Sequence, residues 1–438
     1  FKTYGNVFRI TLLGTPAYVV ANPVDARGPY RDEGGHPDVP FGSFKLLMGD
    51  YPVTSTKDVH GPWRKVFVAA LGPQGLQSMF PKVKAVMEQH LQLWERDGKM
   101  QLFRAARTMG LDLAADVVAD VQLSKDVQTW LDGLFGLPLQ LPGSALSRAL
   151  AAKERLLSLL MREVKQDHEA FKQQWDAAHG DLAKAAAAMN ESADGLGLRY
   201  ATRLGLFGLG ATELRHSAIS LLHGMMAAAD TTRFALFNTW ALLAMSPRVQ
   251  EELHQEQRKV VAEHGPELSY KAACSMPYMD ATIKECLRLL PASAGGLRLL
   301  TADLHVGETI IPSGSHVWLY SSLAHCLDPA LWDGDTACEV PPHMDFRNNL
   351  EQAFRPERWL SEATKPKFYY SFGSGSHLCP GANLVYLEVK TMLALVLRKY
   401  RLRLATPDML RRCSFFPFTV PPAGTDTVLL EPREAAAA

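Results

Sequence analysis

The sequence contains few cysteines, and no two of them form a C-x-x-C pair. Six cysteines occur among 438 residues, all of them between Cys274 and Cys413. A disulfide framework or a zinc ribbon uses more closely spaced cysteines. The sequence therefore argues against both kinds of site and favours a reducing compartment.

The sequence also lacks an excess of charge of either sign and a long apolar run. Lys and Arg number 46, as do Asp and Glu, which argues against a nucleic-acid partner. A membrane-spanning helix needs about 20 consecutive apolar residues, whereas the best candidate, residues 217–229, contains His223 and ends at Asp230. The first ten residues show no charged-then-apolar leader, and the abrupt start predicts that a leader or anchor is absent from this chain.

Hydrophobic residues make up 47% of the chain, enough for a large buried core. Apolar residues three and four apart predict helices at residues 76–94, 145–171, 213–245 and 247–263. Patterns typical of β-strands cover approximately residues 1–25, 297–320 and 402–430. We expect a mainly α protein with a small β region, forming one domain over residues 1–438.

The segment with the clearest chemistry is FGSGSHLCPG, residues 372–381. Its three glycines allow a tight loop whose N–H groups point at the sulfur of Cys379. Pro380 suits the first turn of a following helix, and a helix N-terminus favours thiolate over thiol. A single thiolate held in this way suits one axial bond to haem iron. The alternative is a buried cysteine beside a turn.

This segment resembles the haem-binding signature F-x-x-G-x-[H/R]-x-C-x-G of the cytochrome P450 superfamily, the haem-thiolate monooxygenases. The matching residues are Phe372, Gly375, His377, Cys379 and Gly381. The resemblance implies a single large helical haem-thiolate monooxygenase fold, haem b (iron protoporphyrin IX) as cofactor, and Cys379 as the axial ligand of the iron.

Two further motifs resemble the family in the expected order. Glu285 and Arg288 form an E-x-x-R motif, and Arg358 ends a P-E-R element. Residues three apart on a helix share a face, and two guanidinium groups can grip one carboxylate. The resemblance implies a structural network behind the haem. Taken alone, an exposed Glu–Arg pair is worth only about 0–1 kcal/mol.

The long helix contains Ala227-Ala-Ala-Asp-Thr231, which resembles the oxygen-activation motif of the family. A threonine inside a helix can bond the carbonyl four residues back, here that of Ala227. By resemblance, Thr231 stabilises the iron-bound peroxo species and Asp230 brings protons from solvent. The alternative is a packed helix in which Asp230 pairs with Arg233.

Haem propionates need cationic or donor partners. Residues 60–64, from His60 to Arg64, resemble the H-x-x-x-R element of the family. Residues 295–298, which end at Arg298, resemble its G-G-x-R element. The resemblance implies that His60, Arg64, Arg298 and His377 bind the propionates. Each of them could instead be a solvated surface residue.

Apolar or small residues near these motifs predict a lipophilic pocket. Its expected walls are Met226, Ala227, Ala294, Phe416 and Phe418, although core packing explains each of them as well. Residues 138–150 and the two propionate elements resemble the branch that contains retinoic-acid, sterol and plant-steroid hydroxylases. That branch implies an isoprenoid (sterol, retinoid or terpenoid) substrate.

The sequence has no dinucleotide fingerprint, because the glycine pair at 208 and 210 is followed by Glu213. We therefore expect any NADPH electrons to come from a separate protein. The resemblance implies O2 as a substrate and an NADPH-dependent flavoprotein reductase or a ferredoxin as the electron donor. The resemblance implies membrane association through the missing N-terminal segment, at the endoplasmic reticulum facing the cytosol, with the plastid or the soluble cytoplasm as alternatives. Two other functions stay open: a hydroperoxide-rearranging haem-thiolate enzyme needing neither O2 nor reductase, and a non-catalytic haem sensor.

Overall fold

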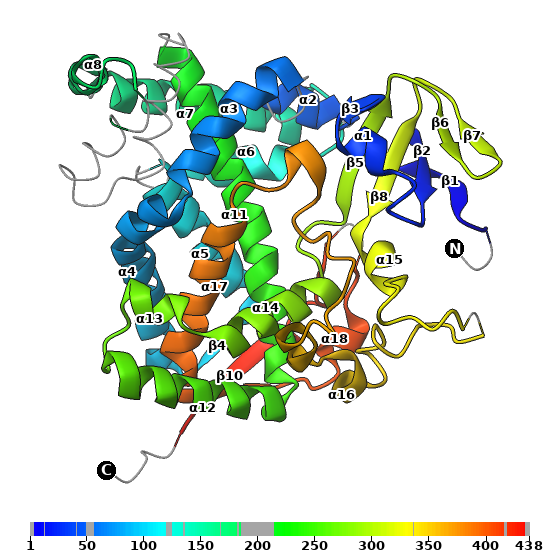
Figure 1. The fold of residues 1–438 in the computed structure, drawn as a ribbon. Helices are drawn as coiled ribbons and strands as arrows, with labels where there is room; N and C mark the ends of the chain where they lie inside the picture. The colour runs from blue at the N-terminus through cyan, green and yellow to red at the C-terminus, as the bar shows by residue number, and fades with distance from the viewer. Residues whose placement is uncertain are drawn as a thin grey trace.

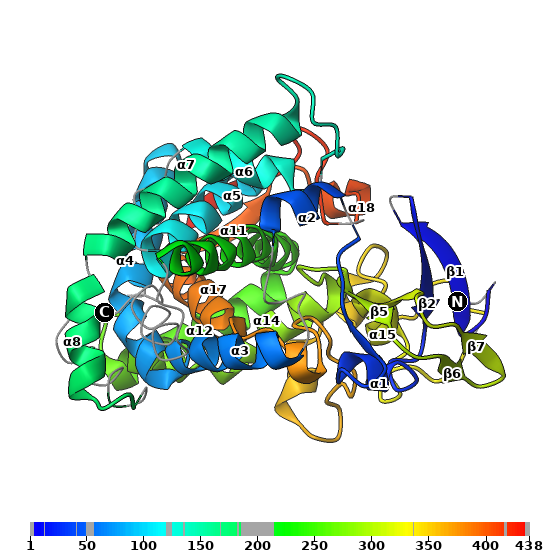
Figure 2. The same ribbon diagram turned by 90° about the horizontal axis from the view of Figure 1, so that it is seen from above.

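The computed structural model of the protein describes residues 4–12, 14–40, 42–49, 57–119, 125–134, 136–166, 168–181, 184, 214–335, 337–415 and 418–433. Helices form the larger part of it, and most strands gather at one side (Figure 1). Figure 2 shows the same division from above, with β1, β2 and β5 on one side and α5, α6 and α7 on the other.

The longest helix, α11 (Leu214–Ala244), passes through the middle of the helical part, and α17 (Ala382–Leu397) lies beside it (Figure 1). α11 makes its most extensive contact with α5 (Leu102–Leu113). Gly110 permits this approach, because a Cβ atom there would lie 2.6 Å from the carbonyl oxygen of Ala229. The close contact buries both helices and fixes the position of α11.

The other long helices surround this centre, and their ends carry the expected signals. Ser246 caps α12 (Pro247–His264) by accepting a hydrogen bond from the Val249 N–H. Pro277 likewise opens α14 (Pro277–Leu289). The remaining longer helices are α3 (Lys57–Ala70), α4 (Pro73–Asp97), α6 (Lys125–Gly133), α7 (Ala145–Gln166) and α8 (His168–Ala177).

Short helical turns connect these elements. The α-helical ones are α1 (Arg27–Tyr30), α2 (Gly42–Met48), α13 (Tyr270–Cys274), α15 (Ser321–Cys326), α16 (Leu350–Ala353) and α18 (Met409–Arg412). A π-helix, η2 (Ala114–Ala119), extends α5, and two 3-10 helices are η3 (Pro356–Leu360) and η4 (Gly375–His377).

The strands form three sheets. The largest has the order β1-β2-β8-β5-β3, from β1 (Val7–Leu12), β2 (Thr15–Val20), β8 (His316–Tyr320), β5 (Gly295–Leu300) and β3 (Gly35–Pro37). Only its β2–β8 pair is parallel among the described pairs. A second sheet has the order β4-β10-β9, from β4 (Lys99–Gln101), β10 (Thr427–Pro432) and β9 (Tyr400–Leu404), and a hairpin joins β6 (Leu304–Val306) to β7 (Thr309–Ile311).

The mainly α fold with a small β region is confirmed, and several details differ from the sequence prediction. The helix expected at 145–171 is divided between α7 and α8. The tail at 402–430 is less regular than expected, because α18 interrupts it and strands occupy only its ends. Residues 176–193 form a polar, alanine-rich stretch of the sequence, and most of them lie outside the described residues. Among the described helices, none is both long and apolar enough to cross a bilayer.

Candidate functional site

The loop that precedes α17 is closed at both of its ends. The Cys379 N–H donates to the carbonyl oxygen of Phe372 at 2.9 Å. The Phe372 ring packs against Tyr386, with ring centroids 5.6 Å apart. Gly381 is the N-cap of α17, and its Cβ position lies 3.8 Å from the sulfur of Cys379. Cys379 therefore lies two residues before the N-cap of a long buried helix. The sequence prediction of a helix directly after the loop is confirmed, but the helix begins at Ala382, so Pro380 precedes its first turn.

Gly375 allows the N-terminal part of the chain to cover this loop. Its backbone has φ +70°, and a Cβ atom there would lie 1.8 Å from the carbonyl oxygen of Tyr30. Only glycine combines this conformation with so close a contact. Tyr30 is in turn fixed to the large sheet, because its hydroxyl accepts a hydrogen bond from the Leu319 N–H at 2.7 Å.

Two opposite effects act on the pKa of Cys379. Burial raises the pKa of the Cys379 thiol, whereas the N–H groups of Gly381 and Ala382 and the charge of Arg64 lower it. Burial outweighs the helix N-terminus, so the protein alone does not favour the thiolate that the sequence predicted. A metal ion coordinated by this sulfur would supply the missing stabilisation, because a metal ion deprotonates a coordinating thiol.

Two stacked histidines lie beside the loop. The rings of His60 and His377 are 3.8 Å apart and 19° from parallel. Nε2 of His377 lies 3.2 Å from Oδ1 of Asp32, and the other oxygen of Asp32 accepts a hydrogen bond from Ser376 at 2.6 Å. Burial, with a contribution from His60, lowers the pKa of His377 to about 4 even though Asp32 opposes the shift.

The two arginines of the predicted propionate set lie at the same loop. Arg64 donates to the carbonyl oxygen of Leu378. Arg298 is buried, with its guanidinium 4.3 Å from the centre of the Tyr30 ring. Its charge also contributes to the low pKa of His377. The structure thus brings His60, Arg64, Arg298 and His377 together around the cysteine loop.

This donor set fits a cofactor that carries carboxylates. Nε of Arg298 and Nδ1 of His377 are buried without a hydrogen bond among the described residues, whereas Nε2 of His377 faces Asp32. Buried polar groups are normally satisfied, and propionate oxygens are suitable acceptors for such donors. Asp32, which the sequence analysis missed, is the one acid of this group; its only local signal is a turn at Asp32-Glu-Gly-Gly.

The middle of α11 has one exposed strip. Between Ser217 and Ala244, only Ala227 and Thr231 are exposed, and both lie on the same helical face. Oγ1 of Thr231 donates to the carbonyl oxygen of Ala227 at 2.6 Å, so the predicted bond to the residue four positions back is present. A central helix with an exposed small-residue face is suited to contact a flat cofactor.

Asp230 makes the contact that the alternative interpretation expected. Its Oδ1 lies 3.5 Å from Nη1 of Arg233. Arg233 is held in place by two rings, those of Phe103 at 4.1 Å and Phe234 at 4.9 Å. Asp230 is therefore paired, with about 30% of its side chain exposed.

A buried acid joins α11 to α17, and the sequence analysis did not identify it. Oε2 of Glu388 accepts a hydrogen bond of 3.1 Å from Thr232, the neighbour of Thr231. Burial raises the pKa of Glu388 to about 8. Its signal in the sequence is a lone acid between Leu387 and Val389, in an apolar helix.

The residues of the predicted structural network are in contact. Both nitrogens of the Arg288 fork bond the carboxylate of Glu285, with Nε to Oε2 at 2.8 Å and Nη2 to Oε1 at 2.9 Å. Nη1 of Arg358 donates to Oε1 at 2.5 Å. Burial opposes the charge of Glu285, yet Arg288 and Arg358 keep its pKa below the usual value. Neither Glu285 nor Arg288 is exposed to solvent.

The network contains further members that the motifs did not reveal. Nε1 of Trp359 donates to Oε2 of Glu285 at 2.9 Å. Nη2 of Arg288 donates to the carbonyl oxygen of His343 at 2.7 Å, and its Nη1 lies 2.9 Å from the sulfur of Met344. These contacts fix the segment between α15 and α16 against α14.

The predicted pocket residues are not all brought together. Met226 packs against a core cluster on α11, and Phe418 stacks on Phe234 with ring centroids 4.5 Å apart. Ala294 lines a different cavity beside Pro291, which none of the other described pocket residues lines. Phe416 lies outside the described residues.

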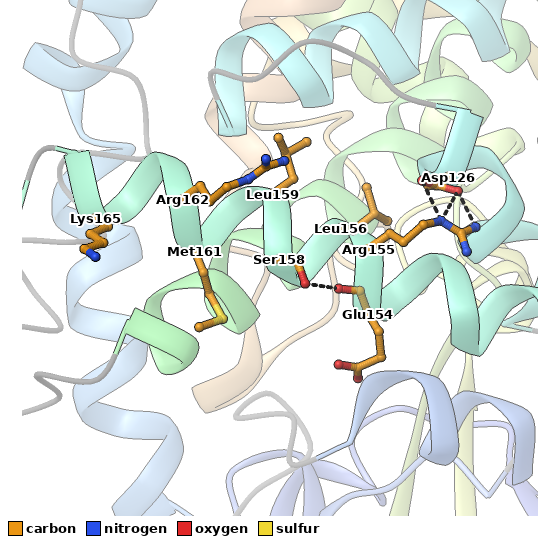
Figure 3. A pocket seen from close by; sticks show the side chains of 9 residues that line it. All are labelled: Asp126, Glu154, Arg155, Leu156, Ser158, Leu159, Met161, Arg162 and Lys165. Atoms are coloured by element: carbon orange, nitrogen blue, oxygen red, sulfur yellow. Dashed lines mark hydrogen bonds and ion pairs between the residues drawn. The ribbon is translucent and has the colours of Figure 1, made fainter.

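An open hollow of about 980 Å³ lies along α7 (Figure 3). Its most prominent interaction is the ion pair between Arg155 and Asp126, with Nη2 and Oδ1 2.6 Å apart. None of the predicted site residues lines this hollow, and we assign it no catalytic role.

Comparison with known proteins gives one consistent family. A family model described as Cytochrome P450 matches residues 1–336 and 350–426. A cytochrome P450 120 of Synechocystis sp. is 26% identical over 82% of this chain and 74% of its own length. Abscisic acid 8'-hydroxylase 1 of Arabidopsis thaliana is 24% identical over 99% of this chain and 85% of its own length. The solved structure of a retinoic acid-bound cyanobacterial CYP120A1 has a similar fold, with a TM-score of 0.76 at 22% identity, covering 99% of this chain and 93% of that chain.

Proposed function

The chain belongs to the cytochrome P450 family, the haem-thiolate monooxygenases, and we propose that it hydroxylates an isoprenoid lipid using O2 and electrons from a separate redox protein. The observation that carries this proposal is the gathering of His60, Arg64, Arg298 and His377 around the loop that presents Cys379. Thr232 also donates to Glu388 at 3.1 Å, which connects α11, directly beside the exposed Thr231, to α17, the helix that Cys379 precedes. The proposed proton-handling residue therefore lies on α11, and the proposed metal ligand lies just before a helix that is joined to α11 in the core.

In this proposal Cys379 is the axial ligand of the iron, and Phe372, Gly375 and Gly381 shape the loop that presents it. When bound, a haem with a thiolate ligand supplies cleavage of the O–O bond and transfer of an oxygen atom to carbon. The structural network of Glu285, which holds the loop-bearing part of the chain against α14, has a scaffold role.

We propose that His60, Arg64, Arg298 and His377 hold the propionates. The buried Nε of Arg298, which has no hydrogen-bond partner among the described residues, supports this assignment. In the protein alone, burial and His60 lower the pKa of His377 to about 4, so its ring there carries one N–H donor, and we propose that it binds as a hydrogen-bonding partner. The two arginines then supply the permanent positive charge.

Thr231 and Asp230 are proposed to deliver protons. The hydroxyl group of Thr231 donates its hydrogen bond to the Ala227 carbonyl oxygen. The Thr231 oxygen is therefore available as an acceptor on the exposed face of α11. A water molecule donating to that oxygen would be held at this face. Asp230 is partly exposed and lies one residue away; release from Arg233 would let it exchange protons with solvent.

The substrate class rests on similarity and on the apolar residues around α11. The relative from Arabidopsis thaliana is named for abscisic acid, which is itself an isoprenoid. Met226, Ala227, Ala294 and Phe418 are proposed walls of the pocket, with Phe416 proposed from the sequence alone. All of them are apolar, as a lipophilic ligand requires.

The electron donor is proposed to be an NADPH-dependent flavoprotein reductase or a ferredoxin. The proposed compartment is the endoplasmic reticulum membrane facing the cytosol, with the plastid or the soluble cytoplasm as alternatives. Turnover with a microsomal reductase and with a plastid-type ferredoxin system, compared side by side, distinguishes the two kinds of donor.

The central experiment uses the haem-loaded protein. Its reduced form should give the carbon monoxide difference band of thiolate-ligated haem, and Cys379→Ser should lose that band. An isoprenoid panel that includes abscisic acid and retinoic acid should contain a ligand that shifts the spin state and gains one oxygen atom in an NADPH-dependent reaction. Turnover of lipid hydroperoxides without NADPH, or ligand binding without any NADPH consumption, would instead favour a rearranging enzyme or a sensor.

A further inference from the structure

One segment of the chain lies outside the family match. The match ends at residue 336 and resumes at residue 350, so residues 337–349 are additional to it. The segment runs between α15 and α16 (Figure 1). It is packed onto the core, because Arg288 donates to the carbonyl oxygen of His343 and the side chain of Phe346 is buried.

The segment lines a partly open cavity of about 460 Å³, which we call the side cavity. Its other walls come from the end of α14, from α15, from β1 and from the C-terminal tail. The apolar lining includes Phe8, Leu290, Leu323, Phe346 and Phe415. Cavities that hold small lipophilic molecules have volumes of roughly 300–1,000 Å³, so the side cavity is large enough for a single lipid chain.

Arg347 and one acid, Asp345, are the charged residues among the described lining of the side cavity. Arg347 is exposed, and its guanidinium lies 4.4 Å from the centre of the Phe415 ring. No described residue forms an ion pair with Arg347. The nearby acid of the lining, Asp345, is engaged by Asn348, whose Nδ2 donates to its Oδ1 at 3.0 Å. Stacking holds the guanidinium in a fixed plane and leaves N–H donors at its edge.

We propose that the side cavity binds a lipophilic carboxylic acid, with its apolar chain among Leu290, Leu323 and Phe346 and its carboxylate paired with Arg347. The apolar lining of the cavity would contact the hydrocarbon chain of the ligand, and Arg347, which has no ion-pair partner among the described residues, would bind its carboxylate. A planar guanidinium matches a carboxylate through two parallel hydrogen bonds. A neutral lipid of the same length would gain the apolar contacts but not the ion pair with Arg347.

The side cavity and the proposed catalytic pocket share one proposed wall, Ala294, and differ in their other described residues. Met226, Thr231 and Phe418 do not line the side cavity. Pro291 and Ala294 do line it, and they belong to the connection between α14 and β5. An acid bound in the side cavity would therefore lie against a segment that is also proposed to border the catalytic pocket.

Calorimetry with dodecanoate and 1-dodecanol tests the proposal. The haem-loaded protein is first saturated with 4-phenylimidazole, which blocks the iron, so that only binding elsewhere is measured. Dodecanoate should bind at one site, and at least about tenfold more tightly than 1-dodecanol, since a charge-assisted bond contributes roughly a factor of 10 to 100. Arg347→Gln should remove this preference and leave 1-dodecanol binding within about twofold. Arg411→Gln, at an exposed arginine of α18, is the matched control and should change neither.

Leu323→Trp should fill the side cavity and abolish binding of both probes, and Leu323→Phe should weaken both to a smaller extent. The carbon monoxide difference spectrum of each variant establishes that the fold is intact. Equal affinity of the two probes, an unaltered preference in Arg347→Gln, or full binding in a correctly folded Leu323→Trp protein would each overturn the proposal. None of these measurements requires catalytic turnover.

Discussion

Replacing Glu388 by glutamine tests whether a neutral buried carboxyl joins the two central helices. Glu388 is 1% exposed, and it accepts a hydrogen bond from Thr232 at 3.1 Å. Burial raises its pKa from 4.5 to about 8, although the bond from Thr232 acts in the opposite direction. The carboxyl group is therefore protonated in the folded protein at neutral pH.

The pH dependence of stability follows from this difference between the two states. In the unfolded chain Glu388 ionises near pH 4.5, so above that pH the unfolded state binds fewer protons than the folded state. The free energy of unfolding then falls as the pH rises, until the folded group also ionises near pH 8. One pKa unit corresponds to about 1.4 kcal/mol. Between about pH 5.5 and pH 8.5, the wild-type protein should lose roughly 3 kcal/mol that Glu388→Gln does not lose.

Urea unfolding of the haem-loaded proteins at these two pH values measures the effect. On going from the lower to the higher pH, the unfolding free energy of the wild-type protein should fall relative to that of Glu388→Gln. Glu308→Gln, at an exposed glutamate in the turn between β6 and β7, is the control and should show no such change. A wild-type-to-variant difference that is the same at both pH values would show that Glu388 is ionised in the folded protein, and the reasoning would be wrong.

Three further substitutions probe the site. Glu285→Gln leaves the charge of the fully buried Arg288 without its carboxylate, and urea unfolding at pH 7 should show a loss of about 3–5 kcal/mol; a loss below about 1 kcal/mol would mean that the network behaves like a surface pair. Thr231→Ala should consume NADPH with much less product per electron pair, whereas Thr231→Ser should retain the coupling; equal coupling in all three proteins contradicts the proposed role. His377→Arg adds a permanent charge beside the propionate donors and should slow haem transfer to apomyoglobin by about tenfold, and a faster transfer would indicate that Asp32 captures the new arginine instead.

Local patterns predicted the parts of the site that depend on neighbours in sequence. The glycines and proline around Cys379 were enough to predict a loop before a helix, although the helix begins at Ala382, after Pro380 and the N-cap Gly381. The spacing of Glu285 and Arg288 predicted a shared face, and the pair has the expected contact. In each case the geometry follows from helix periodicity or from backbone conformation, which a few adjacent residues fix.

Contacts between distant residues escaped the sequence analysis. Asp32 meets His377 across most of the chain, and no periodicity links the two positions. Thr232 and Glu388 likewise lie far apart in the sequence, and their hydrogen bond depends on the packing of α11 against α17. The expectation of a favoured thiolate considered the helix N-terminus but could not weigh the burial of Cys379.

The amino-acid order alone determined the helical class of this protein, its family and the identity of the sulfur ligand proposed for the iron, because these depend on local motifs and on the period of apolar residues. Tertiary structure decided which polar groups lose their water. Burial sets the ionisation of Glu388, stacks two histidines beside Asp32, and turns residues 337–349 into the wall of a cavity. Desolvation depends on everything that surrounds a group in space, so it is known only once the chain is folded.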